Sequence, residues 1–395
     1  MYKISPDIFY IGVNDRVTSL FEGLWPLPTG ITYNSYLVRG SEKTAIIDGV
    51  ELGHAAHQIQ RIKELLGDKA PDYLVINHME PDHSGAIELL RREFPDIIIV
   101  GNSITHRMLE GFFGPVSNTM TIKDGQSLSL GNLTLTFFLT PLVHWPETMM
   151  TYVNERNTIF SGDAFGCFGA LNGAVVDTDM NPDRYFPEMV RYYSNIVGKY
   201  GVHVQRALKK LSAIKIDTIC STHGPVWRAN VDKVIDIYDK LSRYEPLDEG
   251  VTIVYGSMYG NTTRIAETVA AALVEDGIRD IDIHDATYTH LSYILADIFR
   301  HRGLVIASPT YSEAVFPPIQ ALLEALQVRG LKERHTMVVG SYTWASKAGA
   351  RITDILTGCG LQPITETITL RQTPTPEGLE QCRHAAHTLS SLLKS

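Results

Sequence analysis

The last third of the chain repeats one pattern five times, an apolar run of strand length followed by a segment of helix length. The predicted strands are Val251–Tyr255, Ile281–His284, Gly303–Ser308, Thr336–Val339 and Glu366–Leu370, and the predicted helices are Asn261–Glu275, Leu291–Arg300, Pro318–Gln327, Ser346–Thr357 and Glu377–Leu393. Strands joined by helical crossovers favour a parallel sheet with helices on both faces. We therefore expect a doubly wound α/β domain that binds its ligand beyond the carboxyl ends of the strands.

The region before residue 250 follows a different pattern, in which strand-like runs come in pairs. The pairs are Tyr33–Val38 with Thr44–Asp48, and Ser127–Leu130 with Leu133–Phe138. Paired strands with helical stretches between them predict an α+β or αββα layering. The charged segment that contains Pro246 and Gly250 is the best boundary. We therefore expect a first domain at 1–250 and a second at 251–395.

The composition limits the class of protein and its partners. Among 395 residues, Lys and Arg number 35 and Asp and Glu 44, so the net charge is −9. An acidic balance disfavours a nucleic-acid partner, which needs a basic patch. The sequence contains neither an apolar run of about 20 residues nor a signal-peptide pattern, and we expect a cytoplasmic protein with no membrane contact. The four scattered cysteines predict no disulfide framework and no metal knuckle.

The segment Asn77–Gly85 places four potential metal ligands within six residues, directly after an apolar strand. These ligands are His78, Glu80, Asp82 and His83. Imidazole suits zinc, iron, copper and nickel, whereas carboxylate oxygen suits harder ions such as iron or manganese. Such a density of ligands at the end of a strand predicts a metal site.

Three later residues have a similar setting. His144, Asp163 and His223 each follow a strand-like run, close to a turn. Singly, each would more often have a structural role. Together with the group at His78–His83, they predict one metal centre built from separate elements.

The pattern H-x-[EH]-x-D-H, followed by His, Asp and His, resembles the metallo-β-lactamase superfamily, whose αββα fold holds two metals. Hydrolytic zinc members generally have histidine where this chain has Glu80, and the glutamate resembles the diiron version of flavodiiron proteins. Those proteins join this domain to a flavodoxin-like domain in the same order and at about this length. The resemblance implies that His78, Glu80 and His144 hold one iron, that Asp82, His83 and His223 hold the other, and that Asp163 bridges them.

The turn after the first predicted strand of the second domain is rich in glycine and hydroxyl groups and leads into a helix. Such a turn presents backbone N–H groups to a phosphate. Neither GxxxxGK[ST] nor GxGxxG is present, which disfavours a triphosphate or a dinucleotide and leaves a terminal monophosphate. Flavin mononucleotide (FMN) is a ligand that carries such a group. Two further strand ends, which carry aromatic residues, share this edge, and the three loops resemble those of flavodoxin. The predicted FMN-binding residues are Ser257, Met258, Tyr259, Gly260, Asn261, Thr262, Ser308, Pro309, Thr310, Tyr311, Ser341, Tyr342, Thr343, Trp344 and Ala345.

The resemblance implies a flavodiiron oxidoreductase in which electrons pass from a donor through FMN to two irons, where O₂ is reduced to water or NO to N₂O. It also implies a head-to-tail homodimer or a dimer of such dimers. We expect a separate donor, either rubredoxin or a reduced deazaflavin or other flavin donor. Trp25, Leu24 and Trp145 are candidates for residues that select between the gases.

Two alternatives stay open at this point. One is a dinuclear zinc hydrolase with a redox-regulatory flavodoxin domain, which Glu80 disfavours. The other is an electron carrier or sensor whose metal site has decayed, which the filling of all seven ligand positions disfavours.

Overall fold

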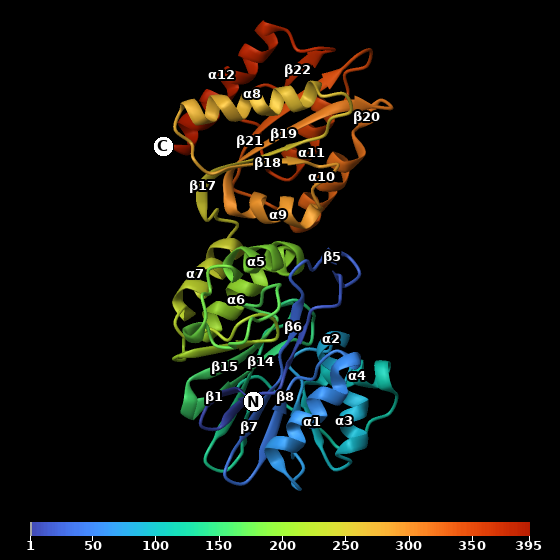
Figure 1. The fold of residues 1–395 in the computed structure, drawn as a ribbon, viewed down its shortest axis with the longest axis vertical. Helices are drawn as coiled ribbons and strands as arrows, with labels where there is room; N and C mark the ends of the chain where they lie inside the picture. Colours follow the sequence, from blue (N-terminus) through green and yellow to red (C-terminus); the bar gives the residue numbers. More distant parts are fainter. Residues whose placement is uncertain (1) are drawn as a thin grey trace. The chain divides into compact units, whose positions relative to one another are not determined.

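The computed structural model describes residues 2–395, which form two compact units. One unit comprises the residues up to Tyr193 together with Val202–Asp239, and the other comprises Ser194–Gly201 together with Lys240–Ser395. Figure 1 shows both units, with the first in blue to green and the second mainly in yellow to red. None of the helices in the described part of the chain is long and apolar enough to cross a membrane.

The first unit contains two main sheets, in agreement with the predicted αββα layering. The seven-stranded sheet has the order β1 (Tyr2–Ser5), β2 (Ile8–Tyr10), β7 (Tyr36–Arg39), β8 (Thr44–Ile47), β9 (Tyr73–Val75), β10 (Ile98–Gly101), β11 (Thr119–Thr121). The five-stranded sheet has the order β12 (Ser127–Ser129), β13 (Thr134–Leu139), β14 (Met149–Val153), β15 (Thr158–Gly162), β16 (Thr218–Ser221). Two short pairs complete it, β3 (Val13–Asp15) with β6 (Ile31–Tyr33) and β4 (Leu20–Phe21) with β5 (Trp25–Pro26).

The helices of this unit are α1 (Ala55–Leu66), α2 (Pro81–Ser84), α3 (Ile87–Glu93), α4 (Ser103–Phe113), α5 (Tyr185–Tyr192), α6 (Gly201–Leu211) and α7 (Val231–Ser242). Strands β8 to β11 are parallel neighbours, and α1, α3 and α4 lie on the crossovers between them (Figure 1). Strands β15 and β16 are also parallel. In each sheet the parallel strands therefore end at one common edge, where side chains distant in sequence can meet.

The second unit has the predicted doubly wound sheet, in the order β18 (Ile281–Asp285), β17 (Asp248–Tyr255), β19 (His301–Tyr311), β21 (His335–Tyr342), β22 (Ile368–Arg371). These five strands are parallel, and β20 (Ala314–Val315) pairs antiparallel with β19. The helices are α8 (Asn261–Glu275), α9 (Leu291–Arg300), α10 (Pro317–Arg329), α11 (Ala348–Gly358) and α12 (Pro376–Leu393). Counted within the unit, the strand order is 2-1-3-4-5, which is the flavodoxin-like order.

All ten elements predicted for this region are present. Two helices, Asn261–Glu275 and Leu291–Arg300, have the predicted bounds, and the ends of the other elements differ from the prediction by up to three residues. Helices α8 and α12 pack on one face of the sheet, where Ile265, Val269 and Leu389 join a core with Ile253 and Val305. The predicted boundary at residue 250 remains a prediction. Strand β17 begins before it, at Asp248, and the longer segment of the compact second unit begins at Lys240.

Candidate metal centre and nucleotide pocket

The seven predicted metal ligands lie together in the first unit, in two groups. His78 to His83 follow β9, His144 lies between β13 and β14, Asp163 follows β15, and His223 follows β16. Both main sheets therefore contribute, from the ends of the parallel strands β9, β15 and β16 and from the loop between the antiparallel strands β13 and β14.

Asp48, directly after β8, holds the start of the loop that carries four of these side chains. Its Oδ1 accepts the Asn77 backbone N–H at 2.7 Å, and its Oδ2 accepts the Asn77 side-chain amide at 2.9 Å. The Thr151 hydroxyl of β14 donates to Asn77 Oδ1 at 2.7 Å. Burial raises the pKa of Asp48 to about 6. Hydrogen bonds therefore fix the start of this loop to both main sheets, and they do not depend on a bound metal.

The first group consists of His78, Glu80, His144 and Asp163, whose ligand atoms all lie within 4.8 Å of one another. Glu80 Oε2 lies 3.1 Å from His78 Nε2 and 3.2 Å from His144 Nε2. The second group consists of Asp82, His83 and His223, within the same limit. Asp82 Oδ2 lies 3.2 Å from His83 Nε2 and 3.3 Å from His223 Nε2.

Asp163 connects the two groups through its two carboxylate oxygens. Oδ2 lies 2.9 Å from His144 Nε2 and 3.5 Å from His78 Nε2, in the first group. Oδ1 lies 2.9 Å from His83 Nε2 and 3.7 Å from His223 Nε2, in the second. One oxygen for each group is the arrangement that a bridging carboxylate requires.

Several buried polar atoms of the second group make no well-directed hydrogen bond within the described residues, although they lie at the short distances given above. They are both carboxylate oxygens of Asp82 and the Nε2 atoms of His83 and His223. Buried polar groups are rarely left unsatisfied, and an ion that is not drawn is one common reason. Converging nitrogen and anionic oxygen atoms fit a divalent or trivalent cation.

The protonation equilibria of the cluster also reflect its negative charge. Burial lowers the pKa of His83, but the charges of Asp82 and Asp163 outweigh it and raise this pKa to about 9. Burial would raise the pKa of Asp163, but the neighbouring His83 and His78 hold it well below its usual value. Without a metal, protons would offset the carboxylate charges, so metal binding must release protons.

Other residues around the cluster were not predicted from the sequence. Glu147 accepts a hydrogen bond from His78 Nδ1 at 2.7 Å, and the Thr32 carbonyl accepts one from His223 Nδ1 at 2.6 Å. The ring of Tyr192 lies 5.5 Å from that of His223, and its buried hydroxyl has no partner among the described residues. Glu147 follows His144 closely in the sequence, which is a possible signal, whereas no local pattern marks Thr32 or Tyr192.

Of the candidates for gas selection, Trp145 lies beside the cluster, with its ring 5.2 Å from that of His78. The Trp25 indole donates to Glu22 Oε2 at 2.9 Å in the short segment around β4 and β5. The Leu24 side chain is exposed.

The second unit contains a pocket of about 430 Å³ at the carboxyl edge of its sheet. All the predicted FMN-binding residues line it except Gly260 and Ser308. Ser308 is buried, where its hydroxyl donates to the Pro309 carbonyl and accepts the Phe316 backbone N–H. The lining residues that the sequence did not predict are Ser312, Glu313 and Gln372.

The shape of this pocket fits a phosphorylated aromatic ligand. Gly260, with φ +87°, starts α8, and no side chain among the described residues caps the first amides of that helix. Free amides at a helix start attract phosphate. At the other loops Tyr311 is half-exposed and Trp344 is 81% exposed, so their rings could cover a flat apolar ligand.

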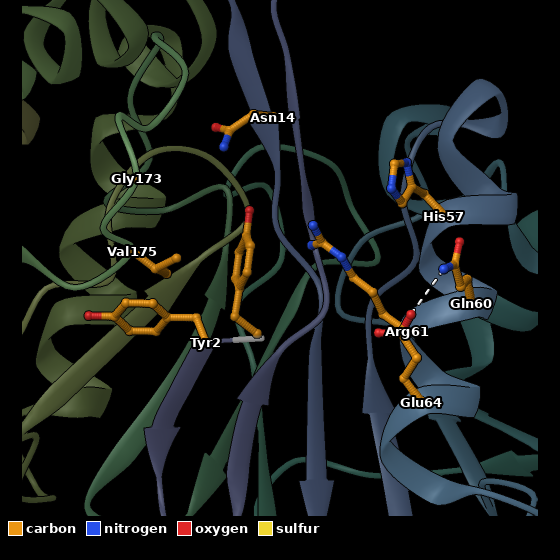
Figure 2. Close-up of a pocket in the computed structure, with 9 residues that line it drawn as sticks. Tyr2, Asn14, His57, Gln60, Arg61, Glu64, Gly173 and Val175 are labelled. Carbon is orange, nitrogen blue, oxygen red and sulfur yellow. Dashed lines mark hydrogen bonds between the residues drawn. The ribbon is translucent and has the colours of Figure 1, made fainter.

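A separate cavity of about 490 Å³ lies elsewhere in the first unit (Figure 2). Arg61 reaches into it from α1, and on the same helix Gln60 donates to Glu64 at 2.9 Å. Tyr2 and Val175 stand on the opposite side. None of the predicted metal ligands lines this cavity.

Comparisons with known proteins agree with the division into two parts. The family described as ODP family beta lactamase matches residues 31–224, and Flavodoxin matches residues 253–385. An anaerobic nitric oxide reductase flavorubredoxin from Vibrio vulnificus is 30% identical over 406 residues, which cover 98% of this chain and 79% of that protein.

Two solved structures are similar over almost their whole length. One is a rubredoxin oxygen:oxidoreductase from Desulfovibrio gigas, with a TM-score of 0.94 and 26% identity, covering 100% of this chain and 98% of the other. The second is a flavodiiron protein from Giardia intestinalis, with a TM-score of 0.94 and 26% identity, covering 99% and 96%.

Proposed function

Since the chain belongs to the flavodiiron protein family, we propose that it is an oxidoreductase that reduces O₂ to water, NO to N₂O, or both, at two irons held by the seven-residue cluster. The similarity to a nitric oxide reductase supports NO as a substrate, and the similarity to a rubredoxin oxygen:oxidoreductase supports O₂.

The position of Asp163 is the observation that carries this proposal. Two cations a few ångströms apart repel each other, and a carboxylate between them offsets that repulsion. Asp163 presents one oxygen to each group, and the Thr222 hydroxyl donates to Oδ1 at 2.6 Å, which fixes the orientation of the carboxylate. We assign His78, Glu80 and His144 to one iron, Asp82, His83 and His223 to the other, and Asp163 to both.

The chemistry of the donors favours iron over zinc. Each group combines imidazole nitrogen with carboxylate oxygen. Glu80 adds a hard anionic donor at the position where the resemblance described above leads one to expect histidine in a zinc hydrolase. Hard anionic oxygen stabilises a ferric ion, whereas zinc does not change its oxidation state. When bound, the two irons supply electrons to the gas and open coordination positions for it.

Aromatic residues of the chain shield the histidines from water. The ring of Phe21 lies 5.3 Å from that of His223, and Tyr192 packs against the same ring and against Phe168. These rings are buried, as are His223 and His78. A dry setting strengthens the electrostatic interactions of the carboxylates and limits the escape of reactive species.

The pocket of the second unit would hold FMN, which supplies one- and two-electron chemistry between the donor and the irons. The amides at the start of α8 and the Thr262 hydroxyl would bind the phosphate, and Tyr311 and Trp344 would flank the ring system. The Thr262 hydroxyl lies 3.3 Å from that of Ser341, so two of the predicted loops meet at this point.

The electron donor and the assembly belong to the same proposal. A separate carrier such as rubredoxin, or a reduced deazaflavin or flavin, would reduce the FMN, and the name of the Desulfovibrio gigas protein supports rubredoxin. We also propose a homodimer or a dimer of dimers, because closed two-fold symmetry is the commonest assembly. The head-to-tail arrangement of the dimer is the one that the family resemblance implies.

The test is an anaerobic single-turnover experiment on purified protein whose iron, zinc and FMN have been quantified. Reduced protein is mixed with O₂ and, separately, with NO, and the oxidation of flavin and the products are followed. We expect two irons and one FMN per chain, and stoichiometric production of water or N₂O. Two zinc ions with hydrolysis of an ester or lactam would favour the hydrolase, and reduced protein that consumes neither gas would favour the carrier.

A further inference from the structure

The buried carboxylate of Glu147 contacts the metal cluster without belonging to it. Its Oε1 accepts hydrogen bonds from His78 Nδ1 at 2.7 Å and from the Met79 backbone N–H at 2.8 Å. Its Oε2 has no hydrogen-bond partner among the described residues. The Asn102 side-chain amide donates to the Glu147 carbonyl at 2.6 Å, which holds the backbone in place. Glu147 therefore places a negative charge in a fixed position at Nδ1 of His78, on the side of the ring away from the cluster atom Nε2.

The histidines of the second group have different support. His223 Nδ1 donates to the neutral carbonyl of Thr32 at 2.6 Å, and His83 Nδ1 has no partner among the described residues. The Nδ1 contacts of three histidines are described, those of His78, His83 and His223. Among these three, His78 of the first group is the one whose Nδ1 donates to a carboxylate. This difference cannot be read from the ligand set, in which each group has two histidines and one terminal carboxylate.

A hydrogen bond at Nδ1 keeps the proton on that nitrogen and leaves the Nε2 lone pair for a metal. A carboxylate attracts the Nδ1 proton more strongly than a neutral carbonyl does. The Nε2 atom of the same imidazole therefore becomes a better electron-pair donor to a metal ion. The strengthened atom, His78 Nε2, lies in the first group, 3.1 Å from Glu80 Oε2 and 3.5 Å from Asp163 Oδ2.

We infer that Glu147 is a positioning residue that strengthens His78 as a ligand and so makes the His78–Glu80–His144 position the tighter of the two metal positions. The inference rests on the proposed function, because it concerns the ions that this cluster would hold. It predicts two unequal binding steps rather than a pair of equivalent sites.

The test is Glu147→Gln, because it separates charge from shape. The glutamine amide oxygen can accept both hydrogen bonds that Glu147 Oε1 accepts, while the charge is lost. Apo-protein is titrated with cobalt(II) in competition with a chelator, and the absorption of the bound ion reports each step. We expect the tighter step of the wild type to weaken 10- to 100-fold in this variant, and the weaker step to stay unchanged.

Glu155→Gln is the matched control, because Glu155 also accepts a backbone N–H, that of Thr134 at 2.8 Å, but takes no part in the cluster. Its cobalt(II) titration should match the wild type. Glu147→Ala removes the hydrogen bonds as well as the charge and should weaken the tighter step at least as much as Glu147→Gln.

Two results would overturn the inference alone. One is an unchanged titration of Glu147→Gln while Glu147→Ala weakens binding, which would show that only the hydrogen bonds count. The other is equal weakening of both steps in Glu147→Gln, which would indicate a general loss of structure. A wild type that binds fewer than two ions would instead overturn the proposed function, and this inference with it.

Discussion

Replacing Asp163 by asparagine should remove the connection between the two metal positions. The two oxygens of Asp163 lie 2.9 Å from His144 Nε2 and 2.9 Å from His83 Nε2, one in each group. Asparagine has one oxygen, and its other arm is an N–H₂ donor that repels a cation. One group therefore loses its shared ligand, and the charge that offsets metal–metal repulsion disappears from both.

The size of the effect can be bounded. Loss of an outer partner of a metal ligand typically costs 10- to 100-fold in affinity, so loss of the ligand itself should cost at least about 100-fold. A factor of 100 corresponds to about 2.7 kcal/mol of stabilisation by bound metal. For units of this size, 1 kcal/mol shifts Tm by roughly 2–4 °C, so the variant should lose roughly 5–11 °C of the metal-induced increase.

The assay measures Tm of each variant with and without iron, together with its iron content. Variants are compared by the increase in Tm that iron produces, and not by Tm itself. The reason is that Asp163→Asn also removes the ionic contacts that Asp163 makes with His83 and His144 in the metal-free protein. Asp177→Asn is the control, since Asp177 is a buried carboxylate that accepts the backbone N–H groups of Arg228 and Ala229 and is not one of the cluster residues. An Asp163→Asn protein with two irons and an undiminished increase in Tm would refute the bridging role.

Three further predictions concern other sites. Thr262→Val should weaken FMN binding by about 1–2 kcal/mol, the value of a charge-assisted hydrogen bond, and titration of apo-protein with FMN should show it. Tyr192→Phe removes a buried hydroxyl that has no partner among the described residues, so urea unfolding should show equal or slightly higher stability. Burial and the charge of Arg300 lower the pKa of His301 to about 4. Between pH 6.5 and 4 the unfolded chain therefore binds a proton at His301 that the folded chain does not bind. The free energy of unfolding should fall by up to about 3 kcal/mol over this pH range. The His301→Gln variant should lose this pH dependence.

Much of the second unit could be predicted from the sequence, because its information is local. Each strand and helix appears as a short apolar run or an amphipathic period, and the strong helix Asn261–Glu275 was predicted to the residue. The parallel order then brings the three loops to one edge. Ser312, Glu313 and Gln372 were not predicted to line the pocket. They lie in turns and have positive φ angles, and this backbone conformation depends on where the neighbouring strands end.

That these seven residues lie together could likewise be predicted, since Asp163 and the histidines follow recognisable strands and match a family pattern. The family resemblance also implied their division into two groups with Asp163 between them. The geometry of that division depends on the two sheets meeting, because Asp163 contacts His78 and His83, which lie 85 and 80 residues before it in the sequence.

Only the tertiary structure decided the outer contacts of the cluster. Glu147 and Thr32 lie far from their histidines in the sequence, and a backbone carbonyl such as that of Thr32 has no sequence signature at all. The same holds for Ser194–Gly201, which lies with the second unit because Arg329 donates to the Ser194 carbonyl at 2.6 Å. Local periodicity specifies which face of an element is buried, but the partner that a buried polar atom finds depends on which distant segment packs against it.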